Sequence, residues 1–162
     1  MRFLLDGMLG RLARWLRLMG HEAKYLADIP DEKMIERAIS ENSILLTRDL
    51  ALYRLAVARG ADVFLVKGST LPDRLANVAR RFNIRLDVDS SASRCPACGA
   101  PVKAVSKEDV KEKVPPTTFK VYDEFWICVN VDCGKVYWRG SHWTKISGVL
   151  LKAKQLSNPV DA

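Results

Sequence analysis

The chain has 162 residues, of which 48% are hydrophobic and 28% charged, a composition typical of one globular domain or of one domain with a small appendage. Lys and Arg number 26 against 19 Asp and Glu, and this basic excess favours a polyanionic partner without identifying it. Asp6 interrupts the first apolar run before a signal peptide could form, and no stretch approaches the roughly 18 uninterrupted apolar residues of a membrane helix. We therefore expect a cytoplasmic protein without a membrane segment.

Short apolar runs alternate with helical patterns over the first 87 residues. The runs predict strands at residues 2–5, 23–26, 43–47, 62–66 and 84–87. Between them, apolar residues spaced by three and four predict helices over residues 8–20, 31–42, 50–60 and 71–82. This alternation predicts an α/β fold of three layers, in which right-handed βαβ units form a mainly parallel sheet with helices on both faces.

Aspartates stand where three of the predicted strands end. Asp6 ends the first strand, Asp28 and Asp31 follow the second, and Asp49 ends the third. Because the carboxyl ends of parallel strands share one edge of the sheet, these carboxylates can converge. Such a cluster suits Mg²⁺ or Mn²⁺ and metal-assisted phosphoryl chemistry. The same aspartates could instead be helix N-caps, and the pattern leaves both interpretations open.

Basic residues lie near these strand ends and could hold the phosphates of a substrate; they are Arg14, Arg17 and Arg48. Other α/β chemistries fit less well, since no glycine-rich phosphate loop and no serine nucleophile motif follows any predicted strand. The only two histidines, His21 and His142, fall in different parts of the chain. A metal-free ribonuclease with paired histidines is therefore disfavoured.

A polar, serine-rich joint at residues 88–94 divides the chain into two predicted domains, residues 1–90 and 91–162. Beyond it lie two cysteine pairs, CPAC at residues 95–98 and CVNVDC at residues 128–133. Paired thiolates at such spacings are typical of a closed, structural Zn²⁺ site, here formed by Cys95, Cys98, Cys128 and Cys133. Two disulfides are the weaker alternative, and His142 remains a minor substitute ligand.

The C-terminal part is predicted to contain strands at residues 120–131 and 135–139 and a closing helix at residues 146–156. Aromatic and basic residues interleave across this segment, and they could stack bases and bind phosphates or form a small aromatic core with a solvated basic face. They are Trp126, Tyr137, Trp138, Trp143, Lys120, Lys135, Arg139 and Lys145.

Several motifs together resemble a PIN-like ribonuclease family, the one named after the C-terminal domain of the mut-seven exonuclease. They are FLLDGMLGRLARWLR at residues 3–17, LTRD at residues 46–49, and the segments CPAC, FWIC, CGKVYW and GSH in the last third. The resemblance implies a PIN-like, Rossmann-type domain followed by a zinc ribbon. It also implies RNA cleavage that depends on Mg²⁺ or Mn²⁺.

Within that resemblance, Asp6 and Asp49 match the family acids, and we choose Asp31 as the third, with Asp28 in reserve. The fourth acid usual in PIN nucleases has no clear counterpart, because Ala51 lies where some relatives carry one. The leading hypothesis is a metal-dependent endoribonuclease. A non-catalytic RNA- or ribosome-binding module and a hydrolase of small phosphate esters are the alternatives.

Overall fold

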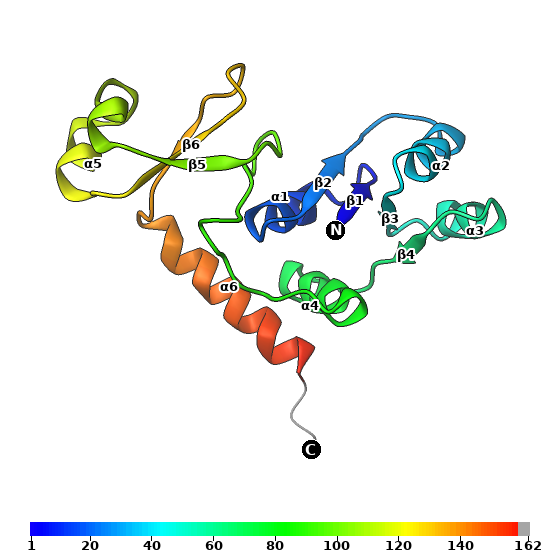
Figure 1. Cartoon of the computed structure of the whole chain (residues 1–162). Helices are drawn as coiled ribbons and strands as arrows, with labels where there is room; N and C mark the ends of the chain where they lie inside the picture. Colours follow the sequence, from blue (N-terminus) through cyan, green and yellow to red (C-terminus); the bar gives the residue numbers. More distant parts are fainter. Residues whose placement is uncertain (159–162) are drawn as a thin grey trace.

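The computed structural model describes residues 1–158 (Figure 1). Strands and helices alternate up to residue 82 as predicted, with boundaries that differ by a few residues. The elements are β1 (Arg2–Leu5), α1 (Gly10–Leu18), β2 (Glu22–Tyr25), α2 (Asp31–Ser40), β3 (Ile44–Thr47), α3 (Leu50–Ala58), β4 (Val63–Leu65) and α4 (Leu71–Phe82).

All four strands are parallel, in the order β2-β1-β3-β4, and helices cover both faces of the sheet. Along β1 the side chains alternate: Phe3 and Leu5 are buried with residues of α1 and α4, whereas Leu4 is buried with residues of α2 and α3. Since successive side chains of a strand point to opposite faces, a fully apolar run is required here. The prediction of an α/β fold with a parallel sheet is confirmed.

Left-handed residues end the first three helices and turn the chain back toward the sheet. Gly20, Asn42 and Gly60 have φ values of 94°, 51° and 76°. After α1, the amide of Gly20 donates to Arg17 and that of His21 donates to Leu16, the two bonds of a Schellman motif. Glycine and asparagine tolerate this conformation best, which is why they were recognisable as helix ends in the sequence.

The predicted strand at residues 84–87 is wrong. Ile84 and Leu86 are buried in the core while Arg85 and Asp87 are exposed, so the alternation is real. This segment nevertheless pairs with no strand of the sheet. Alternating burial requires only an extended chain lying on the core, whereas a strand also needs a neighbour for its backbone hydrogen bonds.

A second, smaller part follows the joint. It contains β5 (Val102–Val105), the 3₁₀ helix η1 (Lys107–Lys113), α5 (Pro116–Val121), β6 (Phe125–Cys128) and β7 (Val136–Tyr137). The three strands form an antiparallel sheet in the order β5-β6-β7. We call this smaller part, residues 95–140, the ribbon. Its apolar cluster is small, with Val110, Val114 and Phe125 as the buried members.

Two predicted strands of this part need correction. Residues 120–121 belong to α5, and the strand predicted from residue 120 begins only at Phe125. Pro116 starts α5, because its fixed φ suits the first helical turn. Val121 is 68% exposed, so the apparent alternation around it had no buried face. The strand predicted at residues 135–139 is reduced to β7.

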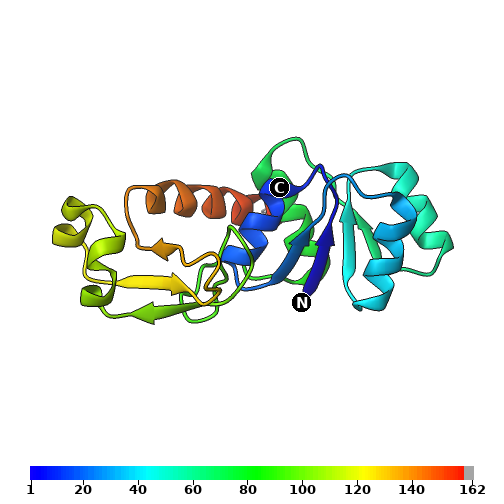
Figure 2. The ribbon, with the colours of Figure 1, turned by 90° about the horizontal axis from the view of Figure 1, so that it is seen from above.

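The closing helix, α6 (His142–Ser157), starts four residues before its predicted beginning and returns to the first part of the chain. It lies beside α4 (Figure 1), and its Leu150 and Ala153 are buried in the same core as β1 and α4. We call residues 1–87, with the four-stranded sheet and its helices, the sheet region. Seen from above, the ribbon extends from one end of the sheet region (Figure 2). The division at residue 90 stays a prediction, but α6 contributes to the core formed by residues 3–86.

The joint itself is anchored to α1. The amide of Arg94 donates to the Arg17 carbonyl at 2.8 Å, and the Ser93 hydroxyl donates to the Leu18 carbonyl at 2.6 Å. Residues that read as a linker in the sequence therefore attach the ribbon to the end of this helix, through one backbone amide and one side chain. None of the helices in residues 1–158 is long and apolar enough to cross a membrane.

Candidate functional site

The carboxyl ends of β1 and β3 lie side by side at the centre of the sheet. From β1 the chain passes through α1 to β2 on one side, and from β3 it passes through α3 to β4 on the other. Helices α1 and α3 cover opposite faces. In open α/β sheets, the crevice where the strand order reverses in this way is the usual ligand site. Asp6 follows β1 at this position, and Asp49 follows β3.

Thr47, the last residue of β3, connects these two aspartates. Its buried hydroxyl donates a short hydrogen bond to Oδ2 of Asp6 and accepts one from the Asp49 amide at 3.0 Å. The Met8 amide donates to the other oxygen of Asp6 at 3.2 Å. Asp6 as a whole is only 8% exposed, and these hydrogen bonds hold its carboxylate in a fixed orientation. Thr47 was not among the predicted site residues; the signal in the sequence that could have identified it is its place at the end of a buried strand, two residues before Asp49.

Asp49 is both an edge residue and a helix cap. Its Oδ1 accepts hydrogen bonds from the amides of Ala51 and Leu52 at 2.8 and 3.2 Å, which satisfies two free donors at the start of α3. The side chain is exposed, and its Oδ2 accepts no hydrogen bond within residues 1–158. Capping and metal binding are thus compatible roles for this one carboxylate.

The third predicted acid lies farther out. Asp31 is exposed in the first turn of α2, the helix that follows β2, and Asp28 precedes it with φ of 57°. Among residues 1–158, only the four cysteines bring three or more His, Cys, Asp or Glu ligand atoms close enough together to hold a metal ion. The structure therefore aligns Asp6 and Asp49 on neighbouring strands and does not gather Asp31 into a compact three-acid cluster with them.

The remaining acids considered as a fourth ligand have other positions. Asp62 immediately precedes β4 and so lies at the opposite edge of the sheet from Asp6. Asp73 forms a capping box with Thr70 at the start of α4, and hydrogen bonds from Thr70 lower its pKa. Ala51 contributes only its backbone, through its amide bond to Asp49.

The three predicted phosphate-binding arginines differ in how far they are engaged. Arg14 is exposed on α1. Arg48 donates to the Gly68 carbonyl at 2.6 Å and so links the β3 edge to the loop after β4. Arg17 donates to the carbonyls of Ala23 and Pro96 at 2.7 and 3.0 Å. Arg17 thus connects the sheet region to the first cysteine turn, and its burial there lowers its pKa.

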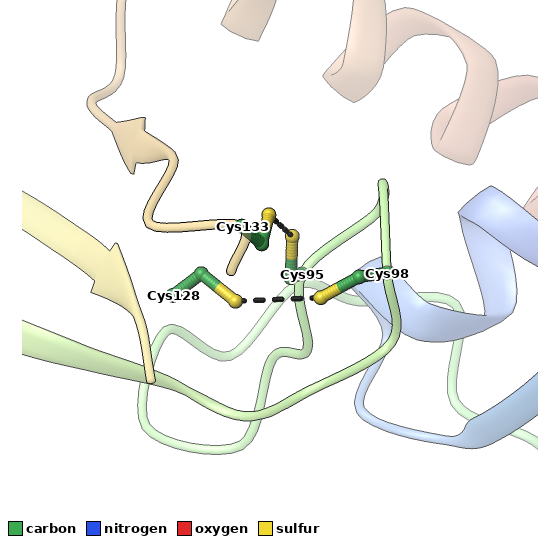
Figure 3. Close-up of side chains that lie close together, drawn as sticks. All are labelled: Cys95, Cys98, Cys128 and Cys133. Atoms are coloured by element: carbon green, nitrogen blue, oxygen red, sulfur yellow. Dashed lines mark hydrogen bonds between the residues drawn. The ribbon is translucent and has the colours of Figure 1, made fainter. Parts of the chain in front are cut away.

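The four cysteines converge on one point (Figure 3). All are free thiols whose sulfur atoms lie within 4.8 Å of one another, with Sγ separations of 3.8 Å between Cys95 and Cys133 and 3.4 Å between Cys98 and Cys128. Four thiolates around tetrahedral Zn²⁺, with Zn–S bonds of about 2.3 Å, are separated by about 3.8 Å. These residues can therefore bind a metal ion such as zinc, as predicted from their spacing.

The cysteine turns are shaped for this arrangement. The Cys95 amide donates to the Ala100 carbonyl and the Gly99 amide to the Cys95 carbonyl, which closes the first turn. Gly99 has φ of 85° and lies against the Arg17 side chain, where an added Cβ would approach Nε to 3.2 Å. The cluster and α1 are consequently in direct contact.

The thiols are not equivalent electrostatically. Burial opposes ionisation of Cys95, but hydrogen bonds from the Tyr137 hydroxyl and from two backbone amides outweigh it and lower the pKa of Cys95 to about 7. Burial raises the pKa of Cys128 to about 12 and also raises the pKa of Tyr137. A cation is needed to stabilise four thiolates in this environment.

A comparison with protein families matches the chain to the model described as Mut7-C RNAse domain, over residues 1–150. No curated protein and no solved structure matches the chain. The matched region includes the Asp6 and Asp49 edge as well as all four cysteines.

Proposed function

We propose, from the premise that the chain belongs to the Mut7-C RNAse domain family, that it is an endoribonuclease that hydrolyses RNA with the help of Mg²⁺ or Mn²⁺. The family supports a ribonuclease-type activity and RNA as the substrate. We further propose that cleavage is endonucleolytic, that the ion is Mg²⁺ or Mn²⁺ and that the sheet region is PIN-like. We also propose an association with ribosomes or ribonucleoproteins.

One observation carries the proposal: Thr47 fixes Asp6 beside the start of α3, whose cap is Asp49, at the crevice where ligands bind in open α/β sheets. Both carboxylates keep lone pairs for a ligand, because Asp6 accepts one hydrogen bond on each oxygen and Asp49 accepts its two on Oδ1. One or two carboxylates with water and substrate phosphate are the usual ligands of Mg²⁺.

The residues present therefore fit a hard divalent ion. Asp6 and Asp49 would hold it, with Asp31 as the proposed third acid. A bound ion would lower the pKa of water and stabilise charge on the phosphodiester oxygens. The chain's own contribution is orientation, since the hydrogen bonds of Asp6 and the capping bonds of Asp49 keep both carboxylates in place before substrate arrives. Arg14 and Arg48 would attract the RNA phosphates.

The cysteine cluster is assigned a structural role in the same proposal. It has four thiol ligands and no open position, which is typical of structural rather than catalytic Zn²⁺ sites. We propose residues 91–162 as a zinc ribbon with a closing helix and residues 1–90 as the nuclease domain, with α6 completing the core of the latter.

The decisive experiment compares RNA cleavage by wild type and Asp49→Asn with added Mn²⁺ or Mg²⁺. Asparagine also caps helices well, so the variant should fold normally while losing the negative charge. We expect cleavage to fall by at least 100-fold. Asp62→Asn, which removes an exposed carboxylate at the opposite edge of the sheet, is the matched control and should cleave like wild type.

Asp6→Asn should lose activity to the same degree. Equal cleavage by wild type, Asp49→Asn and Asp6→Asn would reject the acid assignment and indicate a contaminating nuclease. Comparing Asp31→Asn with Asp28→Asn identifies the third acid, which we expect to be Asp31. Turnover of mononucleotides with no cleavage of RNA would favour a small-molecule phosphoesterase instead.

A non-catalytic RNA-binding module is the second candidate. It is favoured by the separation of Asp31 from a compact three-acid cluster in residues 1–158. RNA binding without cleavage under any divalent ion would support this candidate over the nuclease.

A further inference from the structure

A groove of about 710 Å³ lies between the sheet region and the ribbon. One wall is the exposed side of α1, and the other is formed by β6, β7 and the start of α6. Its volume falls in the range of about 300–1,000 Å³ that is usual for ligand sites. We call the sheet edge that carries Asp6 and Asp49 the acidic edge. These two residues do not line the groove, so the groove is separate from the acidic edge.

All four tryptophans of the chain line this groove, although they come from both parts of the molecule. They are Trp15, Trp126, Trp138 and Trp143. Trp138 packs against the buried Phe125 with ring centroids 6.2 Å apart, and so it also serves the ribbon core. Trp126 lies outside that core cluster and is only half-buried. Aromatic rings with an accessible face are the platforms on which unpaired bases stack.

The charge of the groove is of one sign. Four arginines line it, and within the described residues no aspartate or glutamate does; the arginines are Arg11, Arg14, Arg94 and Arg139. The Arg139 guanidinium lies 5.5 Å from the ring centre of Trp126 and 4.9 Å from that of Trp143, so it joins the two indoles. Arg139 is nevertheless exposed, as are Arg11 and Arg14. A polyanion with flat, aromatic substituents matches this combination of charge and ring faces.

Helix α1 extends from the acidic edge into the groove. This helix begins four residues after Asp6, and its exposed side carries Arg11 and Arg14 into the groove. Nine helical residues span about 14 Å, roughly the length of two to three nucleotides of extended chain. A strand whose bases stack beside Trp126 can thus run its phosphates past Arg14 and Arg11 toward Asp6.

We infer that this groove binds single-stranded RNA and leads it along α1 to the acidic edge. The identity of the polymer as RNA rests on the proposed function; the stacking and the charge match rest on the groove alone. A duplex fits less well, because its bases are already stacked on one another and offer no free ring faces to the tryptophans.

The test exploits the fact that every tryptophan lines the groove. A short unpaired RNA, such as a ten-nucleotide oligouridylate, is titrated into the Asp49→Asn variant without added Mg²⁺ or Mn²⁺, so that the RNA is not consumed. We expect saturable quenching of tryptophan fluorescence by the oligonucleotide, and little quenching by an RNA duplex of the same length.

Two variants locate the binding. Trp126→Leu should weaken the affinity by about tenfold, while Trp126→Phe keeps an aromatic face and should retain most of it. Arg139→Ala should also weaken binding and should reduce the slope of log K against log salt by about 0.7, the value for one lost phosphate contact on a single strand. Arg54→Ala, an exposed arginine on α3 outside the groove, is the charge-matched control and should bind like wild type.

Arg11→Ala tests whether both walls take part, because it changes α1 and leaves the ribbon intact. An unchanged affinity in Arg11→Ala would overturn a groove shared by the two parts, and unchanged affinity in Trp126→Leu and Arg139→Ala would overturn the assignment altogether. Cleavage by the wild type reports separately on the nuclease. Cleavage with no effect of these variants rejects only the groove, whereas groove binding without cleavage rejects only the nuclease.

Discussion

The sheet region and the ribbon are held together by different forces. The sheet region has two large buried clusters, one on each face, and its strand residues Leu4, Leu5, Leu45 and Leu46 are completely buried. The apolar cluster of the ribbon has only three buried members, Val110, Val114 and Phe125, beside four converging thiols. Burial of apolar surface can stabilise the first, while a core as small as the second usually needs a metal or a disulfide. We therefore expect the stability of the sheet region to depend on apolar burial and that of the ribbon to depend on a bound metal.

Metal removal should produce the largest difference between the two. Binding of Zn²⁺ by four thiolates contributes on the order of 10 kcal/mol to the folding of small metal domains. We expect a chelator, or Cys128→Ser, to unfold the ribbon while β1 and β3 stay folded. Amide hydrogen exchange measures this directly: protection should be lost in β5 and β6 and retained in β1. Ribbon amides that stay protected after the metal is gone would contradict the comparison.

Removing apolar volume from the sheet should have the opposite effect: it should destabilise the sheet region and leave metal binding by the ribbon unchanged. Leu46→Ala leaves a cavity at a fully buried site and should lower the free energy of unfolding by about 2–5 kcal/mol, measured by urea denaturation. Leu50→Ala, at a position 47% exposed, is the matched control and should change it by less than about 1 kcal/mol. The zinc content of both variants should equal that of wild type.

Loss of the hydrogen bonds at the acidic edge should lower stability less than Leu46→Ala does, but it should lower cleavage activity more. Thr47→Val removes the hydroxyl that serves both Asp6 and Asp49, and should cost about 1–3 kcal/mol because buried polar groups lose a partner. Cleavage should fall with it, whereas Thr47→Ser keeps the hydroxyl and should retain activity. A fully active Thr47→Val would show that orientation of Asp6 by this residue is unimportant.

The smallest expected effect concerns pH. Burial lowers the pKa of His21, which packs edge-on against Phe3, and the N-terminal charge lowers it further. Its folded pKa thus lies below the unfolded value of about 6.5. Its contribution to stability is complete above about pH 6.5 and is lost as the pH falls through the folded value. His21→Gln should flatten the decline of the urea midpoint toward acid, while His142→Gln, at an exposed position, should decline like wild type.

The sequence predicted best where a local pattern had one structural solution. Buried strands followed by aspartates, and cysteine pairs followed by glycine, required no knowledge of distant contacts. The segment around Ile84 was misassigned because pairing with a neighbouring strand is not encoded locally. Helix α5 was missed because its last two residues, 120 and 121, were assigned to a strand.

For the candidate site too, some features were predictable from local sequence patterns and others were not. The position of Asp6 and Asp49 at one edge of the sheet followed from the alternation of strands and helices, but the pairing of β1 with β3, which makes their strands neighbours, did not. The link through Thr47 could not, since it depends on the register that sets Leu5 opposite Leu46. The groove depends on how α1 meets the ribbon, which no local pattern in either segment specifies.

The return of α6 to α4 has a consequence for biosynthesis. Leu150 and Ala153 close a core whose other members lie before residue 87, so a nascent chain lacks part of that core until the last helix has been translated. The ribbon is complete earlier, by residue 140. Once α6 has formed, both ends of the ribbon are attached to the sheet region. Synthesis from the N-terminus normally lets the first domain fold first. In this chain the sheet region, which is synthesised first, would finish folding last.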